Sequence, residues 1–239
     1  MILILGGTSD GARLTASLYT EGYDVMESLS GVTQNPRVRE HPVRSGGFGG
    51  PDGLQAFIKD AGVHAIIDAT HPYAKNISWN VCAAASRAKI PVLRYERVPW
   101  PIAPGWTIVG DYREASAALP TGARAFLTVG GQSLSPFSDR ADVWYLFRAI
   151  EPVDNPFTNG EALIERPPFT FDDELALMQN HRISHLVTKN SGGAATFAKI
   201  EAATYLKLPI IVVERPVLPV VETVTAFSDV TDWLSRLRK

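Results

Sequence analysis

What the sequence lacks already restricts what the protein can be. Cys82 is the only cysteine among 239 residues, so no intrachain disulfide can form, and its alanine-rich surroundings are typical of a small core residue. No apolar run reaches ~18 residues, the length expected of a membrane-spanning helix. Met1 leads straight into an apolar run without a basic leader, so no secretory signal is predicted and a cytoplasmic location is expected.

An excess of charge of one sign is also missing. The formal net charge is −2, which argues against binding to nucleic acid through bulk attraction to phosphate. Hydrophobic residues make up 45% and charged residues 20%, so the chain can bury a core and disorder is not expected. We expect one large domain or two small ones. The protein should bind neither nucleic acid nor membrane and act as a monomer or a small homo-oligomer.

Residues 1–13 carry the strongest pattern. Ile2–Leu5 is an apolar run of the length typical of a buried strand, and helical spacing begins at Ala12. A glycine turn lies between them. We expect its backbone N–H groups and the following helix N-terminus to bind the phosphate of a dinucleotide. The turn consists of Gly6, Gly7, Thr8, Ser9, Asp10 and Gly11. The alternative is a tight strand-to-helix connection that binds no ligand.

The next segment bears on which dinucleotide would bind. Residues 23–30 indicate a second strand, at whose end a Rossmann domain meets the adenosine ribose. Small hydroxyls with a nearby arginine suit the 2′-phosphate of NADP, and Ser28 and Ser30, followed by Arg37, Arg39 and Arg44, provide that combination. Glu27 facing the ribose would instead favour NAD. We predict NADPH, although a place in a solvated loop is the alternative for any single arginine of this region.

Four glycines surround one aromatic residue in the stretch that follows. Glycine loses more backbone entropy on ordering than any other residue, so this composition needs a reason. We predict a loop that lies flat against the dinucleotide, and a flexible surface loop is the alternative. The predicted contacts are Gly46, Gly47, Phe48 and Gly49. Asp52 is expected to cap a helix over residues 53–61.

A third predicted strand, after Val63, ends in a polar turn. Ligands bind at the carboxyl ends of strands in open α/β sheets, so the turn residues are expected near a ligand. Pro72 keeps His71 out of a helix. We assign Thr70 to the cofactor site and name His71 and Tyr73 as candidate proton donors, with water as a further candidate. A hydrogen-bonded turn histidine is the alternative reading of His71.

The two halves of the chain echo each other. Lys89–Arg97 and Lys207–Arg215 share the pattern Pro-x-x-x-x-Glu-Arg, and an alanine-rich helix precedes each. The glycine turn has a counterpart at residues 129–131. A repeat of this length predicts two similar α/β units with a ligand cleft between them, chance similarity being the alternative. The proline-rich segment after Val98 is a natural boundary between the halves and divides the chain into domains at 1–104 and 105–239.

Together these motifs resemble the precorrin-6A reductase family of corrin-ring (cobalamin) biosynthesis. The matching segments are Gly6–Gly11, Arg44–Gly50, Asp68–Ala74, Arg94–Trp100, Lys189–Gly193 and Glu214–Pro216. The resemblance implies two Rossmann-like domains with mainly parallel sheets, of which 1–104 binds NADPH and 105–239 binds substrate. Strand exchange between the domains is one option. It also implies NADPH-dependent reduction of the C18–C19 double bond of precorrin-6A. Many relatives carry Gly-Arg where this chain has Gly31-Val32, and Arg37 is therefore our candidate for the 2′-phosphate.

The substrate implied by the resemblance is a tetrapyrrole with several carboxylates. Cationic side chains and backbone N–H groups are its expected partners. The predicted substrate-binding residues are Arg148, Lys189, Asn190, Ser191, Gly192, Gly193 and Arg215. No metal site is predicted. Two alternatives stay open, a cobalt-precorrin-6A reductase of the anaerobic route and a non-catalytic NADP-binding sensor. No tyrosine has a lysine four residues later, which disfavours a short-chain dehydrogenase.

Overall fold

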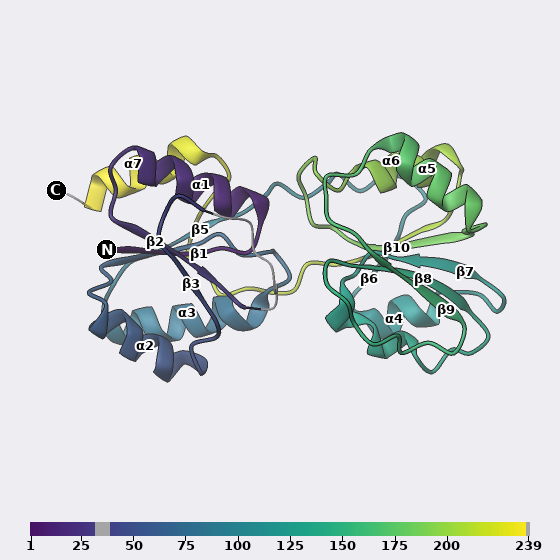
Figure 1. Ribbon diagram of the computed structural model, residues 1–239, viewed down its shortest axis with the longest axis horizontal. Coiled ribbons are helices and arrows are strands. Elements are labelled where there is room, and N and C mark those ends of the chain that lie inside the picture. The colour runs from purple at the N-terminus through teal and green to yellow at the C-terminus, as the bar shows by residue number, and fades with distance from the viewer. Residues whose placement is uncertain (32–38, 238–239) are drawn as a thin grey trace. The chain divides into compact units, whose positions relative to one another are not determined.

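The computed structural model describes residues 1–31 and 39–237, and these form two six-stranded sheets in which every pairing is parallel. The chain divides into two compact units. Unit 1 consists of Met1–Arg97 and Pro216–Lys239, and unit 2 of Val98–Arg215. Each sheet carries helices on both faces (Figure 1). The predicted α/β class with mainly parallel sheets is confirmed. Among the described residues no helix is long and apolar enough to cross a membrane.

The sheet of unit 1 has the strand order β12-β5-β4-β1-β2-β3. Its strands are β1 (Ile2–Leu5), β2 (Val25–Leu29), β3 (Val43–Ser45), β4 (Ala65–Asp68), β5 (Val92–Tyr95) and β12 (Glu222–Val224). Its helices are α1 (Ser9–Thr20), α2 (Gly50–Asp60), α3 (Lys75–Ala88) and α7 (Phe227–Leu237). Figure 1 shows α1 and α7 on one face and α2 and α3 on the other.

The alternation of side chains along β1 explains why this strand is apolar throughout. Ile2 and Ile4 belong to the core that contains Leu14 of α1 and Trp233 of α7. Residues 3 and 5 belong to the opposite core, with the buried residues of α2 and α3. A parallel strand covered on both faces loses the polar alternation of a half-exposed strand. Packing on both faces therefore holds β1 in the interior of the sheet. The glycine turn that follows β1 lies at the carboxyl edge of the sheet.

The sheet of unit 2 repeats this order as β6-β11-β10-β7-β8-β9. Its strands are β6 (Thr107–Val109), β7 (Arg124–Leu127), β8 (Trp144–Ala149), β9 (Gly160–Ile164), β10 (His185–Lys189) and β11 (Ile210–Val213). Its helices are α4 (Tyr112–Ala117), α5 (Phe171–Asn180) and α6 (Ala198–Tyr205), with short 3-10 helices η1 (Gly131–Ser133) and η2 (Ser135–Phe137). One core joins the sheet to α5 and α6 through residues such as Phe126, Met178 and Ile200.

The two units exchange their sixth strands. β6 follows β5 along the chain but pairs with β11, whereas β12 follows β11 and pairs with β5. Strand exchange, one option implied by the family resemblance, is therefore confirmed. The predicted division at 104/105 differs from the structure, because residues 216–239 belong to unit 1. The reason is packing: Val230, Trp233 and Leu234 of α7 are buried in the core of unit 1. The predicted cleft stays a prediction.

Two helices begin elsewhere than predicted. α2 begins at Gly50, after Gly49 in the left-handed region at φ 77°, and has no side-chain cap. Asp52 lies in its first turn and pairs with Arg87 at 2.5 Å, so the predicted capping role is wrong. The alanine-rich segment after Gly193 predicts a helix over residues 194–206, but α6 begins only at Ala198. A tighter turn precedes it, closed by a bond of 3.1 Å from the Phe197 N–H to the Ala194 carbonyl.

Candidate functional site

The three glycines of the first turn are required for two different reasons. A Cβ atom at Gly6 would clash with the Glu27 carboxylate, and one at Gly11 would lie 3.2 Å from the Ala69 carbonyl oxygen. Both are therefore explained by packing within unit 1. Gly7 has φ 96°, and nothing lies within 4 Å of where its Cβ would be. It is the position of this turn where the backbone is open to a ligand.

The polar residues of the turn are held in place by their neighbours. Thr8 caps α1, because its Oγ1 accepts the Gly11 N–H at 2.9 Å and donates to the Ala69 carbonyl at 3.1 Å. The Asp10 carboxylate is paired with Arg97, whose Nη2 also donates to the Ser9 Oγ at 3.3 Å. These contacts fix the N-terminus of a 12-residue helix beside an open glycine. That is the geometry in which helices bind phosphate.

Glu27, which would favour NAD if it faced a ribose, is fully buried. Its Oε2 lies 2.8 Å from the His41 Nε2 and 3.2 Å from the Arg39 Nε. His41 is buried as well. The Arg39 guanidinium offsets the carboxylate charge, and protein atoms cover both of its oxygens. In this arrangement the Glu27 side chain packs against Gly6, and its carboxylate is not accessible to a ligand.

Arg44 of β3 joins the end of β2 to the glycine-rich loop. Its Nη1 donates to the Ser28 Oγ at 2.8 Å and to the Gly46 carbonyl at 2.9 Å, and its Nη2 lies 3.3 Å from the Gly47 carbonyl. The guanidinium carbon lies 3.8 Å from the centre of the Phe48 ring. Ser28 and the loop, both predicted to contact the cofactor, are thus brought together by Arg44, one of the three arginines noted after the second predicted strand. Ser30 is exposed just beyond β2.

The loop glycines divide into two groups. Gly46, Gly49 and Gly50 have positive φ angles of 110°, 77° and 88°, a backbone conformation that favours glycine. Gly47 has no such angle, and nothing lies within 4 Å of where its Cβ would be. Among the described residues nothing explains its lack of a side chain. The predicted contact of Gly47 with the dinucleotide stays a prediction.

The turn after β4 is built around a buried carboxylate. Asp68 accepts hydrogen bonds of 2.6 Å from the hydroxyls of Thr70 and Ser78, and the Arg94 Nε lies 3.7 Å from its Oδ2. His71 accepts the Tyr73 N–H on its Nδ1 at 3.2 Å. Asp68, Thr70, His71 and Arg94 help to line a cavity of about 10 Å³, room for roughly one water molecule. Thr70, His71 and Tyr73 are thus gathered at the carboxyl edge, as predicted.

In unit 2 the Lys189–Gly193 motif forms hydrogen bonds with Trp100, near the start of this unit, and with Arg215, at its end. The Asn190 side chain accepts the Trp100 N–H at 2.7 Å and donates to the Trp100 carbonyl at 2.9 Å. The Trp100 indole donates to the Gly193 carbonyl at 2.8 Å, and the Arg215 Nε donates to the Asn190 carbonyl at 2.8 Å. Asn190, Gly193 and Arg215 were predicted to bind substrate. In the structure their hydrogen bonds join the first and last segments of unit 2 to this motif. Ser191 and Gly192 are buried between them.

Two lysines lie near this motif with lowered pKa values. Burial lowers the pKa of Lys189, at the end of β10, to about 8. Lys199 on α6 is buried, and its pKa is lowered to about 7, mainly by desolvation, with Glu174 acting in the opposite direction. Its Nζ donates to the Thr196 carbonyl at 2.6 Å and lies 5.1 Å from the Trp100 ring centre. Sequence reasoning missed Lys199, whose alanine-rich helix gave no signal of burial.

Arg148, which was predicted to bind a substrate carboxylate, is already paired with two carboxylates of the protein. Its guanidinium makes bonds of 2.5 and 3.3 Å to the two oxygens of Glu174, and its Nε lies 3.1 Å from Glu165. Phe169 covers one face, with its ring centre 3.8 Å away. A substrate carboxylate would have to displace one of these acids. Arg37, predicted to contact the 2′-phosphate, falls in residues 32–38, outside the described residues.

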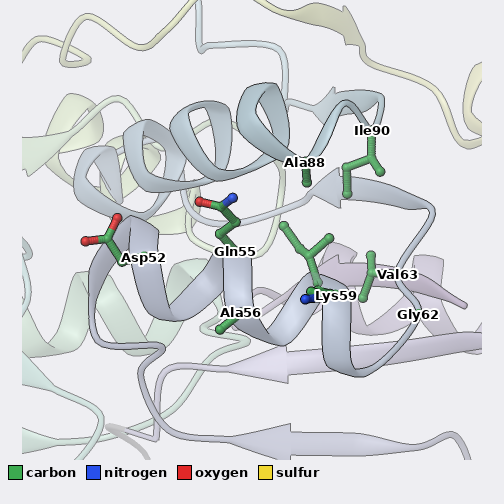
Figure 2. A pocket seen from close by; sticks show the side chains of 9 residues that line it. Asp52, Gln55, Ala56, Lys59, Gly62, Val63, Ala88 and Ile90 are labelled. Carbon is green, nitrogen blue, oxygen red and sulfur yellow. The ribbon is translucent and has the colours of Figure 1, made fainter.

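A pocket of about 610 Å³ between α2 and α3 is not at this edge of the sheet (Figure 2). Val63 and Ile90, two of its lining residues, precede β4 and β5, so the pocket extends to the amino ends of these strands. Figure 2 shows Gln55 and Lys59 of α2 opposite Ala88 at the end of α3. Ligands of open α/β sheets bind at the carboxyl ends. We therefore place the candidate site at the glycine turn and the polar turns, despite the size of this pocket.

Two parallel, doubly covered sheets with a glycine turn before a capped helix define a Rossmann-like α/β protein. Comparison with known proteins makes this specific. The model of the family "Precorrin-6x reductase CbiJ/CobK" matches residues 1–235, so the chain belongs to this family of reductases. The resemblance seen in the sequence is confirmed, as is the expectation of a reductase of cobalamin biosynthesis that acts on a C=C bond.

Individual relatives agree with this assignment. A precorrin-6A reductase of Rhodococcus erythropolis is 42% identical over 244 residues, covering 100% of this chain and 98% of the relative. A cobalt-precorrin-6A reductase of Priestia megaterium is 34% identical, with 98% of each chain covered. The solved structure of a CobK precorrin-6A reductase matches with a TM-score of 0.93 at 38% identity, covering 98% of this chain and 96% of that one.

Proposed function

We propose that this chain catalyses the NADPH-dependent reduction of the C18–C19 double bond of precorrin-6A. One hydride goes from NADPH to C19 and one proton to C18, which leaves NADP⁺ and the dihydro product, precorrin-6B. The observation that carries the proposal is membership of the reductase family over residues 1–235. Reductases of this family need a reduced nucleotide cofactor, and unit 1 contains residues that fit one.

The glycine turn is the part of unit 1 that fits the pyrophosphate. The open backbone at Gly7 and the capped N-terminus of α1 offer N–H groups and a positive dipole end. Gly47 permits a second close approach, beside Arg44 and Ser28. When bound, the nicotinamide would supply the hydride. The chain's own task is to hold the nucleotide in a fixed orientation and to exclude water, since a small misplacement costs much of the rate.

Substrate binding is proposed for the Lys189–Gly193 motif and Arg215 of unit 2, with Arg148 as a further cation near it. Lys189 supplies a positive charge for a substrate carboxylate, and its pKa of about 8 keeps most of that charge at neutral pH. His71 and Tyr73 remain the candidate proton donors for C18. The His71 Nδ1 accepts a backbone N–H, which leaves the Nε2 position to carry a proton.

The metal-free substrate is favoured over its cobalt form. The precorrin-6A reductases of Rhodococcus erythropolis and Rhodobacter capsulatus are 42% and 38% identical to this chain. The cobalt-precorrin-6A reductases of Priestia megaterium and a Synechocystis strain are 34% and 28% identical. We therefore expect faster turnover of precorrin-6A than of cobalt-precorrin-6A.

The test is an assay of NADPH oxidation with each substrate form, with the product identified by mass spectrometry. We expect oxidation only when substrate is present and a mass gain of two hydrogens. In the same assay, His71→Ala should lower turnover more than NADPH affinity, and unchanged turnover would remove His71 from the mechanism. Binding of NADPH without oxidation in the presence of either substrate would support the sensor alternative instead.

A further inference from the structure

Arg44 is a partly buried cation whose hydrogen bonds all go to neutral groups. Its partners are the Ser28 hydroxyl and the carbonyls of Gly46 and Gly47. Burial lowers its pKa, which means that the surroundings disfavour its charge. Within the described part of the chain it makes no ion pair with a carboxylate. A charge that is partly removed from water is stabilised by a partner of opposite sign, and Arg44 has none among the described residues.

Other arginines of unit 1 differ from Arg44 in this respect. Arg39 is paired with Glu27, Arg94 with Asp68 and Arg97 with Asp10. The exposed Arg87 on α3 is paired with Asp52. Arg44 therefore stands apart as an arginine at the carboxyl edge of the sheet whose charge is not offset by an acid. This difference points to an anion that comes from outside the protein.

The position of Arg44 says which part of a nucleotide that anion belongs to. Arg44 pairs in register with Ser28 at the carboxyl ends of β2 and β3, next to β1 and its phosphate-binding turn. In Rossmann-like sheets the end of β2 meets the ribose of the adenosine. Glu27 does not oppose a phosphate there, because it is fully buried and paired with Arg39 and His41.

Arg44 is also held in a fixed orientation. Its guanidinium lies over the Phe48 ring, with 3.8 Å between its carbon and the ring centre. Guanidinium has five N–H donors, and the three bonds to Ser28, Gly46 and Gly47 use three of them. Two donors therefore remain for a ligand. A planar cation with two free donors and a stacked face is suited to phosphate.

We propose that Arg44 binds the 2′-phosphate of NADPH and makes the enzyme select NADPH over NADH. This inference rests on the proposed function, and it assigns to a described residue the role that sequence reasoning gave to Arg37. Arg44 acts together with Ser28, whose hydroxyl holds the guanidinium at the end of β2. The alternative is that Arg44 only shapes the glycine loop. That role would affect NADPH and NADH equally, because both nucleotides contact the same loop.

The experiment measures nucleotide binding by calorimetry, without substrate, for wild type and Arg44→Gln. The probes are 2′,5′-ADP, which carries the 2′-phosphate, and 5′-AMP, which lacks it. We expect wild type to prefer 2′,5′-ADP, and Arg44→Gln to weaken its binding about 10- to 100-fold, the range of a lost charge-assisted contact, while 5′-AMP binding is unchanged. Arg44→Lys should restore part of the preference. Arg87→Gln, at an exposed paired arginine, is the matched control and should behave as wild type.

Each other result separates this inference from the proposed function. Equal weakening of both probes by Arg44→Gln would show a role in loop shape and overturn the inference. A variant that keeps the preference for 2′,5′-ADP would also overturn it, and NADPH dependence would then rest on another residue. Wild-type protein that binds neither probe nor NADPH would overturn the proposed function together with the inference. Retained 5′-AMP binding shows that the variant is folded.

Discussion

The two units have the same strand order, yet within the described residues their glycine turns lead into different structures. In unit 1 the chain passes from β1 through Gly7 into the 12-residue helix α1. At the matching place in unit 2 it passes from β7 through Gly130 into two 3-10 helices of three residues each. So short a helix has no aligned row of peptide dipoles to attract an anion. The two units thus share the order of their strands but differ in the helix that follows the glycine turn at the carboxyl edge of the sheet.

The strand ends of the two units differ in charge as well. Asp68 ends β4 opposite Arg94 of β5, whereas Thr188 holds the same register position opposite Val212. The buried acid of unit 1 is thus replaced by a hydroxyl, which bonds to Thr128 at 2.9 Å. Unit 2 instead places Lys189 at this edge, with the buried Lys199 nearby. Positive charge suits a substrate with carboxylates, in line with the proposed division of labour.

The largest effect is expected from the exchanged segment that completes unit 1. Trp233→Ala removes a buried side chain from the core between α7 and the sheet, which should cost about 3–5 kcal/mol. Hydrogen exchange followed peptide by peptide should show lower protection in β1, β4 and β5 and little change in β7 and β10. Tyr205→Ala, at an exposed residue of unit 2, is the control. Equal loss of protection in both sheets would mean that the units are not separate folding entities.

An intermediate effect is expected from matched substitutions in the two glycine turns. Gly7 and Gly130 have φ angles of 96° and 87°, so alanine at either should cost about 1–2 kcal/mol of stability through backbone strain alone. Only Gly7→Ala places a methyl group at the phosphate turn, and we expect NADPH to bind about tenfold or more weakly. Fluorescence titration measures this affinity. Comparable weakening by Gly130→Ala would erase the distinction between the two turns.

A third effect concerns pH and the buried lysine of unit 2. The pKa of Lys199 is about 7 in the folded protein and about 10.4 in an unfolded chain, so the unfolded state binds more protons between these values. This residue therefore makes the free energy of unfolding rise as pH increases from 7 to 10. As pH falls back to 7, the folded protein is destabilised again, because the buried Lys199 binds a proton less readily than it does in the unfolded chain. Lys199→Met should remove the rise, as urea titrations at pH 7 and 9.5 would show. If the free energy of unfolding changed with pH equally in wild type and Lys199→Met, the lowered pKa of Lys199 would not be the cause of the rise.

The sequence predicts much of the fold because its strands are short apolar runs and its turns contain glycine. It could not place residues 216–239, because a strand's edge partner depends on contacts far along the chain. Glu27 shows a similar limit at the site: its spacing fits a ribose-binding acid, but its partners Arg39 and His41 bury it. Asn190 was recognised by its motif, and only the structure shows that it holds Trp100.

The strand exchange also sets an order of events during protein synthesis. Unit 2 is encoded without interruption, so all six of its strands are synthesised before β12 and α7. Unit 1, although its first strand is made first, stays one edge strand and one covering helix short until the last part of the chain appears. Domains fold as units as they emerge. Unit 1 is therefore the later of the two to be completely synthesised, although its strand β1 is made before any strand of unit 2.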